Sequence, residues 1–376
     1  MLCYSGSINQ RNRIIEMNTQ IKIAVVGFGL IGKRHVDIIV RTPGIKLCGV
    51  VEPSKENAVD ASRYGAPVFN NIEELFNKDV PDGIVLATPT PLHLEQGLLC
   101  IDKGCPLLVE KPITVTSLDA SKLTAAAAEA NVPLLVGHHR RHNGMVQAAK
   151  AALSDGLIGN IRAIQGTCWF YKPDDYFDKA PWRKKKGAGP ISVNLVHDVD
   201  LLRHFCGDVS SVRATSVRSQ RGFENEDLAT AVLCFTNGAI ATISVSDSIV
   251  GPWSWELTAR ENAAYPATSE SCYLIGGSLG GMSLPDLRVW KHEKRPDWWT
   301  PITATNLKYK TEDPLHMQML HFGNVILGEE EPLVSGLEGL KSLEVVEAVA
   351  ASAESGKEIF LNNNDLENQR VKRFGL

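Results

Sequence analysis

The chain has 376 residues, of which 44% are hydrophobic and 22% charged, and its formal net charge is −4. This length exceeds one ordinary domain and suits two, and the composition is that of a globular protein able to bury a sizeable core. A mildly acidic chain lacks the basic surface of nucleic-acid-binding proteins, and no apolar run approaches the ~18 residues of a membrane helix. We therefore expect neither a nucleic acid partner nor a membrane.

The first third of the chain alternates short apolar runs with segments of helical spacing. The runs predict strands, and the segments predict helices with Ser54 as a plausible N-cap. Such alternation is typical of βαβ units that build a doubly wound parallel sheet, the Rossmann type. The predicted strands are Ile21–Gly27, 46–51, 83–87, 106–109 and 133–136, and the helices are 30–40, 54–64, 92–103 and 117–130.

The pattern changes after about residue 140, where longer alternating strands predict a large, mostly antiparallel open sheet in an α+β domain. Asn237-Gly238 is a strong hairpin signal between two of these strands. The predicted domains are 21–140 for the cofactor and 141–376 for substrate and oligomerisation, and we leave open whether the closing helices pack back on the first domain. The predicted strands are 161–171, 209–219, 227–235, 239–247, 256–260 and 270–275, and the helices are 144–154, 189–207, 314–327 and 337–355.

The cysteines and the N-terminus bear on the compartment. Eight cysteines are dispersed without a C-x-x-C pair, which argues against a zinc knuckle or redox motif and favours a reducing, cytoplasmic setting. Residues 1–20 lack the apolar segment and cleavage site of a signal peptide, so we interpret them as a poorly ordered extension. No residues are assigned to a metal.

A glycine-rich turn follows the first predicted strand. Gly27-Phe28-Gly29-Leu30-Ile31-Gly32 is G-x-G-x-x-G at the start of a helix, the context in which this motif binds the pyrophosphate of a dinucleotide. Glu52 ends the second strand about 20 residues further on, where an acid receives the ribose hydroxyls. A carboxylate there repels a 2′-phosphate, so NAD is favoured over NADP.

Two further motifs follow later strands of the same sheet. Thr88-Pro89-Thr90, with His93 close behind, follows one strand, and Glu110-Lys111-Pro112 follows the next. Doubly wound sheets bind their ligands at the carboxyl ends of the strands. An ammonium such as that of Lys111 could bind a substrate oxygen there and stabilise negative charge as it develops.

Together these motifs resemble the glucose–fructose oxidoreductase / inositol dehydrogenase / MocA (Gfo/Idh/MocA) family in order and spacing, over about residues 21–360. The resemblance implies a sugar or polyol dehydrogenase, with Lys111 on the reacting hydroxyl and a Lys111–Pro112 bond that is often cis. It also implies a cofactor site made by the glycine turn, Glu52, the Thr88–Thr90 turn, His93, Glu110 and Lys111. In members of this family the open sheet of the second domain often forms the oligomer interface, so the resemblance implies a homodimer or homotetramer.

The segment 189–207 predicts one helix with an apolar stripe and a polar stripe. A polar stripe on such a helix would be explained by a cleft that binds substrate. Alcohol oxidation needs a base, and a histidine suits this role; the resemblance places His197 on the family's active-site histidine. Many members carry Asp four residues earlier, where this chain has Val193, and Asn194 could instead bind a substrate hydroxyl. Further candidate substrate ligands are Arg183, Tyr171 and Arg140.

Two other functions stay open at this point. The missing Asp would suit an NAD-binding sensor or co-regulator without turnover, and the same fold could support a hydrolase or epimerase that retains NAD. The predicted partner is in each case a small sugar or polyol, which the residues do not identify further.

Overall fold

The computed structural model describes residues 20–361, and all but the last residue of the predicted extension 1–20 lies outside them. The described chain forms two compact units. Unit 1 comprises residues 20–142 and Glu312–Leu340, and unit 2 comprises Asn143–Thr311 and residues 341–361. The range 312–340, whose packing was left open above, thus belongs to unit 1. Among the residues 20–361, no helix is both long and apolar enough to cross a membrane.

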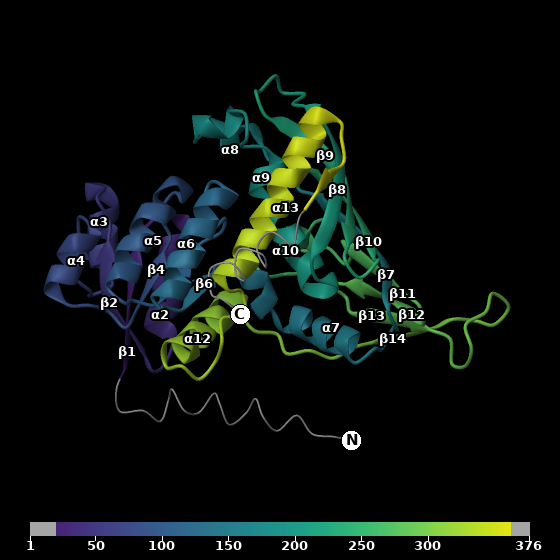
Figure 1. The fold of residues 1–376 in the computed structure, drawn as a ribbon, viewed down its shortest axis with the longest axis horizontal. Helices are drawn as coiled ribbons and strands as arrows, with labels where there is room; N and C mark the ends of the chain where they lie inside the picture. The colour runs from purple at the N-terminus through teal and green to yellow at the C-terminus, as the bar shows by residue number, and fades with distance from the viewer. Residues whose placement is uncertain (1–19, 362–376) are drawn as a thin grey trace, which may run out of the picture. The chain divides into compact units, whose positions relative to one another are not determined.

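Unit 1 contains a six-stranded parallel sheet in the order β3-β2-β1-β4-β5-β6, which is the Rossmann order and confirms the predicted class (Figure 1). The chain reverses its direction of sheet growth between β1 and β4, so a ligand crevice is expected at their carboxyl ends. The strands are β1 (Ile21–Val26), β2 (Ile45–Val51), β3 (Val68–Phe69), β4 (Gly83–Leu86), β5 (Leu107–Val109) and β6 (Leu134–Val136).

The strands β1, β4, β5 and β6 are nearly continuous apolar runs, because helices cover a parallel sheet on both faces. A Cβ added to Gly83 on β4 would meet the side chains of Ile326 and Phe322, which shows how closely the late helix α12 packs on this sheet. The helices of unit 1 are α2 (Leu30–Arg41), α3 (Lys55–Ser62), α4 (Ile72–Lys78), η1 (Thr90–Leu92), α5 (His93–Asp102), α6 (Ser117–Glu129), η2 (His139–His142) and α12 (Pro314–Ile326).

Unit 2 contains a nine-stranded sheet in the order β14-β13-β12-β11-β7-β10-β9-β8-β15. It is mostly antiparallel as predicted, but β7 and β10 pair in parallel, so their carboxyl ends lie at one edge. The predicted Asn237-Gly238 hairpin joins β9 to β10, with Gly238 at φ +83°. The strands are β7 (Ile161–Trp169), β8 (Val209–Arg218), β9 (Glu226–Phe235), β10 (Ile240–Ser246), β11 (Tyr273–Gly277), β12 (Gly280–Leu284), β13 (Arg288–Lys291), β14 (Thr303–Asn306) and β15 (Ile359–Phe360).

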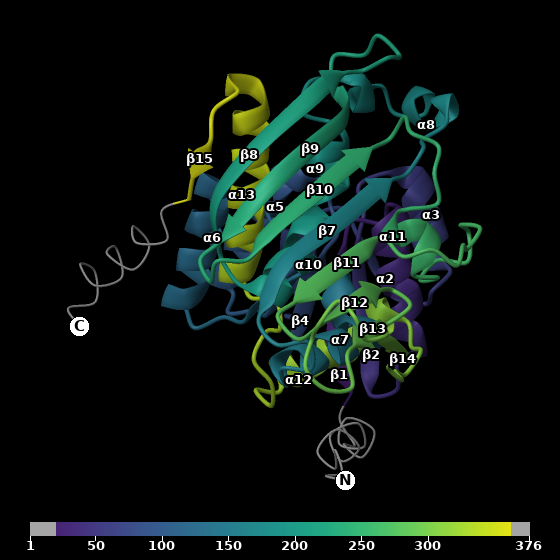
Figure 2. The ribbon, with the colours of Figure 1, turned by 90° about the vertical axis from the view of Figure 1, so that its right-hand side faces the viewer.

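Helices cover one face of this sheet, and the other face is open to the viewer in Figure 2. The buried core lies on the covered face, where apolar residues of β7 to β10 meet those of α10, α7 and α13. The helices of unit 2 are α7 (Gly144–Ser154), α8 (Asp174–Asp178), η3 (Pro181–Lys184), α9 (Pro190–Val193), α10 (Leu195–Cys206), α11 (Trp255–Thr258) and the latter part of α13 (Gly336–Ser355).

The structure corrects several predicted elements. The segment 256–260 is not a strand: α11 occupies this region, because the Ser254 hydroxyl accepts the Leu257 N–H and caps a helical turn. The predicted helix 189–207 breaks at Asn194 into α9 and α10. Ser54 does occupy the N-cap of α3, but its side chain makes no capping bond. Elements that we did not predict are β3, α4, η2, α8, η3, β12, β13, β14 and β15.

Candidate functional site

The glycine turn after β1 is shaped by close backbone packing. Gly27 has φ +91°, and a Cβ there would lie 2.8 Å from the carbonyl oxygen of Ala87. A Cβ on Gly32 would lie 2.0 Å from the carbonyl oxygen of Gly27. Around Gly29, by contrast, a Cβ would meet nothing within 4 Å. Two glycines are therefore required for packing, and the third leaves open backbone that a phosphate can approach.

Helix α2 begins directly after this turn, with Gly29 as its N-cap. Its first turn has no capping side chain and no acidic residue, so the first backbone N–H groups have no side chain to receive them. These N–H groups and the positive end of the helix dipole attract anions. Leu30 is 88% exposed beside them, whereas Phe28 is buried. The turn thus fits the pyrophosphate of a dinucleotide.

Glu52 fixes the end of β2 to this turn. One carboxylate oxygen accepts the Phe28 N–H at 2.9 Å, and the other accepts the Ser54 N–H at 2.8 Å. The side chain is 8% exposed, so a negative charge is held close to the turn at the position that the sequence predicts. This charge disfavours a 2′-phosphate, which supports NAD over NADP.

The Thr88 turn is braced by His93 rather than left free. The His93 imidazole lies 2.9 Å from the Thr88 carbonyl oxygen through Nε2, and 3.1 Å from that of Pro112 through Nδ1. Burial lowers the pKa of His93, and the contacts with these carbonyl oxygens act in the opposite direction. The imidazole therefore joins the loops after β4 and β5. Pro89 is exposed and Thr90 half-buried, and the contact of this turn with a cofactor stays a prediction.

A buried hydrogen bond between Glu110 and His35 positions the segment that carries Lys111. Glu110 Oε1 lies 2.7 Å from His35 Nε2 on α2, and its Oε2 accepts the Lys111 N–H at 3.2 Å. Burial alone would raise the pKa of Glu110, but the hydrogen bond to His35, together with the electrostatic contributions of His35, Lys111 and His139, holds this pKa below its usual range. A Cβ on Gly137 would meet the Glu110 side chain at 3.0 Å. Glu110 is thus fully engaged as a positioning residue, while Lys111 is half-buried and is followed by the expected cis bond to Pro112.

Arg140 lies on η2 in unit 1 and is 3% exposed. Its neighbour Arg141 forms an ion pair with Glu338 at 2.9 Å. The histidines around them do not form a metal centre: no group of three or more His, Cys, Asp or Glu suited to a metal occurs in the residues 20–361. The role of Arg140 as a substrate ligand stays a prediction.

In unit 2 the predicted base lies just after a helix break. Asn194 separates α9 from α10, and its carbonyl oxygen accepts the His197 N–H at 3.1 Å. His197 is half-buried on the first turn of α10, whose other faces are anchored by polar contacts. The Tyr273 hydroxyl donates to Asp198, and Ser342 Oγ bonds Asp200 at 3.2 Å. The helix that carries His197 is therefore held rigidly within unit 2.

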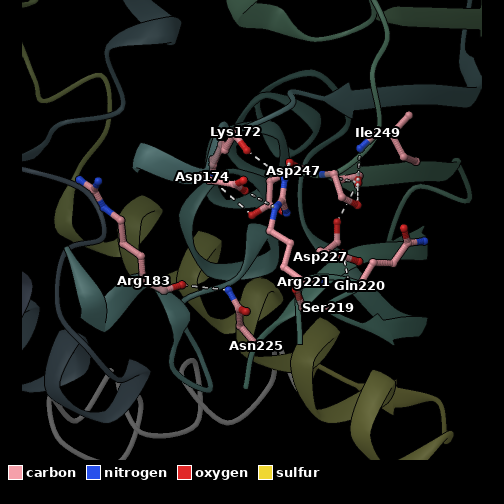
Figure 3. Close-up of polar contacts among 12 residues, drawn as sticks. Lys172, Asp174, Arg183, Ser219, Gln220, Arg221, Asn225, Asp227, Asp247 and Ile249 are labelled. Atoms are coloured by element: carbon pink, nitrogen blue, oxygen red, sulfur yellow. Dashed lines mark hydrogen bonds and ion pairs between the residues drawn. The ribbon is translucent and has the colours of Figure 1, made fainter. Parts of the chain in front are cut away.

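A charged cluster that sequence reasoning missed lies at the carboxyl ends of β7 and β10 (Figure 3). Lys172 follows β7, and its N–H donates to the Asp247 carbonyl oxygen at 2.9 Å. Its ammonium donates to Asn194 Oδ1 at 2.6 Å and lies 3.9 Å from Asp247 Oδ2. Arg221 donates to Asp247 Oδ1 at 3.1 Å. The sequence does place charged residues after two strands whose residues alternate between apolar and polar. This pattern indicates a cluster only once β7 and β10 are known to be parallel.

Two predicted substrate ligands lie near this cluster. The Arg183 guanidinium stacks 3.9 Å from the ring centre of Tyr176 and donates to the Tyr176 carbonyl oxygen at 2.6 Å. The Arg183 carbonyl oxygen accepts a hydrogen bond from the Asn225 side chain, as Figure 3 shows. Tyr171 is 47% exposed, with Arg221 5.4 Å from its ring centre. Arg183 is thus largely committed to Tyr176, and the roles of both residues as substrate ligands stay predictions.

Comparisons with known proteins agree with this geometry. Residues 21–138 match the model of an oxidoreductase family with an NAD-binding Rossmann fold, and residues 146–264 match the Gfo/Idh/MocA C-terminal domain. The chain is 24% identical to a D-apiose dehydrogenase from Paraburkholderia graminis, over 92% of this chain and 91% of the relative. It is 27% identical to an inositol 2-dehydrogenase from Mycolicibacterium gilvum, over 82% of this chain and 86% of the relative.

Among solved structures, the WlbA dehydrogenase from Bordetella pertussis in complex with NADH and UDP-GlcNAcA superposes with a TM-score of 0.72. The two chains are 26% identical, and the superposition covers 91% of this chain and 99% of the WlbA chain. The class of the molecule is therefore an NAD-dependent oxidoreductase with a Rossmann domain. The chain belongs to the Gfo/Idh/MocA family of oxidoreductases.

Proposed function

We propose that this chain is a dehydrogenase that moves a hydride between NAD and a secondary hydroxyl or carbonyl of a sugar, inositol or related polyol. The observation that carries the proposal is that one helix, α2, links the glycine turn to the segment with Lys111. Helix α2 starts at the open backbone of Gly29, and its residue His35 contacts Glu110, which precedes Lys111. Relatives named as apiose and inositol dehydrogenases support this class of substrate.

Bound NAD supplies the acceptor for the hydride, and the chain's own residues must bind the alcohol and take its proton. The residues that would hold the cofactor are those of the glycine turn, with Glu52 for the ribose. Lys111 would donate to the reacting oxygen and stabilise its developing charge. His197 would accept the proton, for which a ring with a pKa near neutrality is suited.

The experiment is a screen of NADH formation from NAD, run beside NADP, over inositols, hexoses, alditols and their acids. We expect turnover with NAD and a loss of roughly 100- to 10,000-fold in kcat for His197→Gln, since a positioned base contributes about that much. Lys111→Ala should abolish turnover and leave NAD binding largely intact. Tight NAD binding without turnover of any polyol would favour the sensor instead, and reduction of bound cofactor without NADH release would favour the cofactor-retaining hydrolase or epimerase.

The proposal includes assembly through the open face of the large sheet. Cross-strand partners form a row of exposed side chains over five strands, which are Arg213, Val232, Thr242, Gln165 and Leu274. A hollow of about 320 Å³ lies on the same face and includes Trp169 and Trp253 in its lining. A broad, flat face of this kind suits a second copy of the sheet, as the family resemblance implies for a homodimer or homotetramer.

Light scattering after size exclusion tests the assembly. Val232→Asp should shift the protein to a smaller species, whereas the control Val59→Asp, on an exposed position of α3 in unit 1, should not. An unchanged mass for both variants would refute the role of the sheet face. We also propose a cytoplasmic setting, which the free thiols of all seven cysteines in the described range support.

A further inference from the structure

The Lys172 ammonium is unusually enclosed for a charged group. It is 6% exposed, and Asn194, which receives its one hydrogen bond among the residues 20–361, is 8% exposed. An ammonium has three donors and no acceptor, and buried donors without partners are costly. Tyr176 offers only its ring face, 5.1 Å from Lys172 Nζ. The protein side chains described here therefore leave donor capacity at Lys172 for a ligand.

Lys172 also determines what Asn194 can bind. Because an ammonium only donates, the Asn194 amide must present Oδ1 to it, and the amide nitrogen is then the group left for a ligand. Asn194 can thus donate to a ligand oxygen. With the bond between Nζ and Oδ1 at 2.6 Å, the two nitrogens lie within about 5 Å of each other. That separation lets the two oxygens of one carboxylate bridge them.

Charged groups of both signs surround Lys172. Lys172 shares its surroundings with the acids Asp247 and Glu256 and with the cation Arg183. Asp247 is held by Arg221 at 3.1 Å, while Lys172 Nζ stays 3.9 Å away, beyond hydrogen-bonding distance. Glu226 and Asp227 also lie close to Asp247, so the acids of this group outnumber its cations. Burial raises the pKa of Asp247 and lowers the pKa of Lys172, because both charges are largely removed from water. A ligand would therefore be recognised through the donors of Lys172 and Asn194 rather than through an excess of positive charge.

We propose that Lys172 and Asn194 form a two-donor site for the carboxylate of the substrate, so that the enzyme acts on a sugar acid or other polyhydroxy acid rather than on a neutral polyol. This inference rests on the proposed function. Asn194 lies one helical turn before His197, so an acid bound there has its nearby hydroxyls on the same turn as the predicted base. Asp247 and Arg221 position the ammonium and do not themselves contact the substrate.

The test uses matched pairs that differ only in a carboxylate against a CH₂OH group: D-glucuronate with D-glucose, D-galacturonate with D-galactose, and D-gluconate with D-glucitol. Binding to the NAD-loaded full chain is measured by calorimetry and turnover by NADH formation. We expect each acid to bind roughly 10- to 100-fold more tightly than its neutral partner, the usual range for a hydrogen-bonded charge. Lys172→Met should remove this preference, with a much larger loss of affinity for each acid than for its neutral partner.

The control variant is Lys179→Met, whose ammonium is 74% exposed and pairs with Asp175 on the surface; it should keep the preference. Asn194→Leu provides a second variant if Lys172→Met fails to fold. If both variants fail to fold, the affinity of the wild-type chain for each acid and for its neutral partner remains the test. Equal or weaker binding of the acids by the wild-type chain overturns the inference, as does an equal loss for both members of each pair in Lys172→Met. Acid binding without NADH formation keeps this inference and removes the proposed dehydrogenase; turnover of neutral polyols alone does the reverse.

Discussion

The cofactor half and the substrate half of this molecule are built in different ways. In unit 1 the site groups follow directly on the ends of neighbouring parallel strands, as Gly27 follows β1, Thr88 follows β4 and Glu110 follows β5. In unit 2 the Lys172 cluster is assembled from β7, the helix break at Asn194 and the end of β10. The first arrangement is local in sequence, and the second depends on how distant strands pair.

The forces that hold the two sites differ as well. Backbone exclusion shapes the glycine turn, where a Cβ on Gly32 would lie 2.0 Å from a carbonyl oxygen. Compensation between buried charges shapes the Lys172 cluster, where Arg221 and Lys172 share Asp247. A steric site should therefore fail abruptly on a small increase in volume, whereas an electrostatic site should fail when one partner of a pair is removed.

The largest effect is expected for Gly32→Ala. The new methyl group would overlap the Gly27 carbonyl, which is backbone and cannot move away like a flexible side chain. We expect a loss of more than about 3 kcal/mol in the free energy of unfolding and loss of NAD binding, measured by chemical denaturation and by titration with NADH. The matched control is Gly29→Ala, which has open space around its Cβ and should fold normally but bind NAD more weakly. Equal stability of the two variants would contradict the steric account.

The next effect tests the charged cluster. Arg221→Met leaves Asp247, which is 1% exposed, with only the distant Lys172 ammonium as a counter-charge. We expect a loss of about 3 kcal/mol in the free energy of unfolding, because removing one partner of a buried pair leaves an uncompensated charge. Arg295→Met, at an exposed position between β13 and β14, should change stability by less than about 0.5 kcal/mol. A similar small change for both would show that the cluster contributes little to folding.

The fold of unit 1 and its site segments were predictable because each depends on a local signal. Apolar runs, glycine spacing and an acid at a strand end identified β1, the turn, Glu52 and the Lys111 segment before any tertiary contact was known. The brace that His93 forms and the pair of Glu110 with His35 were not predictable, because both join segments far apart in the chain.

Unit 2 was harder to predict for the same reason. The helix break at Asn194 has no proline or glycine to mark it. The Asn194 side chain accepts a hydrogen bond from Lys172, which follows the distant strand β7. The short strands β13 and β14 lie at the edge of the sheet and carry a weak alternating pattern. Their strand character depends on pairing with a neighbour, which a single sequence does not reveal.

A smaller effect, which depends on pH, is expected for Glu110→Gln. The pKa of Glu110 in the folded chain lies below its usual value, which is about 4. Ionised Glu110 therefore stabilises the fold fully above about pH 4, and this contribution is lost as the pH falls through the lowered pKa. The variant should be about 1–3 kcal/mol less stable than the wild type at pH 7, and the gap should narrow below pH ~4. Thermal unfolding between pH 7 and pH 3 measures it. Glu95→Gln, on an exposed position of α5, is the control, and a gap that is constant with pH would rule out the ionised pair.

The smallest effect concerns α4, an element that we failed to predict although its signal is present. Asn71 Oδ1 accepts the Glu74 N–H at 2.8 Å and caps the helix. Glu74 Oε2 accepts the N–H of Asn70, the residue before the N-cap, at 2.9 Å, an arrangement similar to a capping box. Asn71→Ala should cost about 1 kcal/mol, and Asn71→Asp should cost less because an acid suits a helix N-terminus. Thermal unfolding of both variants beside Asn57→Ala, on exposed α3, measures the difference.

NAD affinity, measured in the same Asn71 variants, tests whether the cofactor site depends only on its own contiguous residues. Ile72 and Leu75 bury α4 in unit 1, and α4 packs on β2, the strand that ends at Glu52. Because Glu52 is held by the N–H groups of Phe28 and Ser54 and not by α4, the cap should affect stability and leave NAD affinity unchanged. A parallel loss of NAD affinity in Asn71→Ala would mean that the turn depends on its flanking helix, and the cofactor site would then be less local than its contiguous motif indicates.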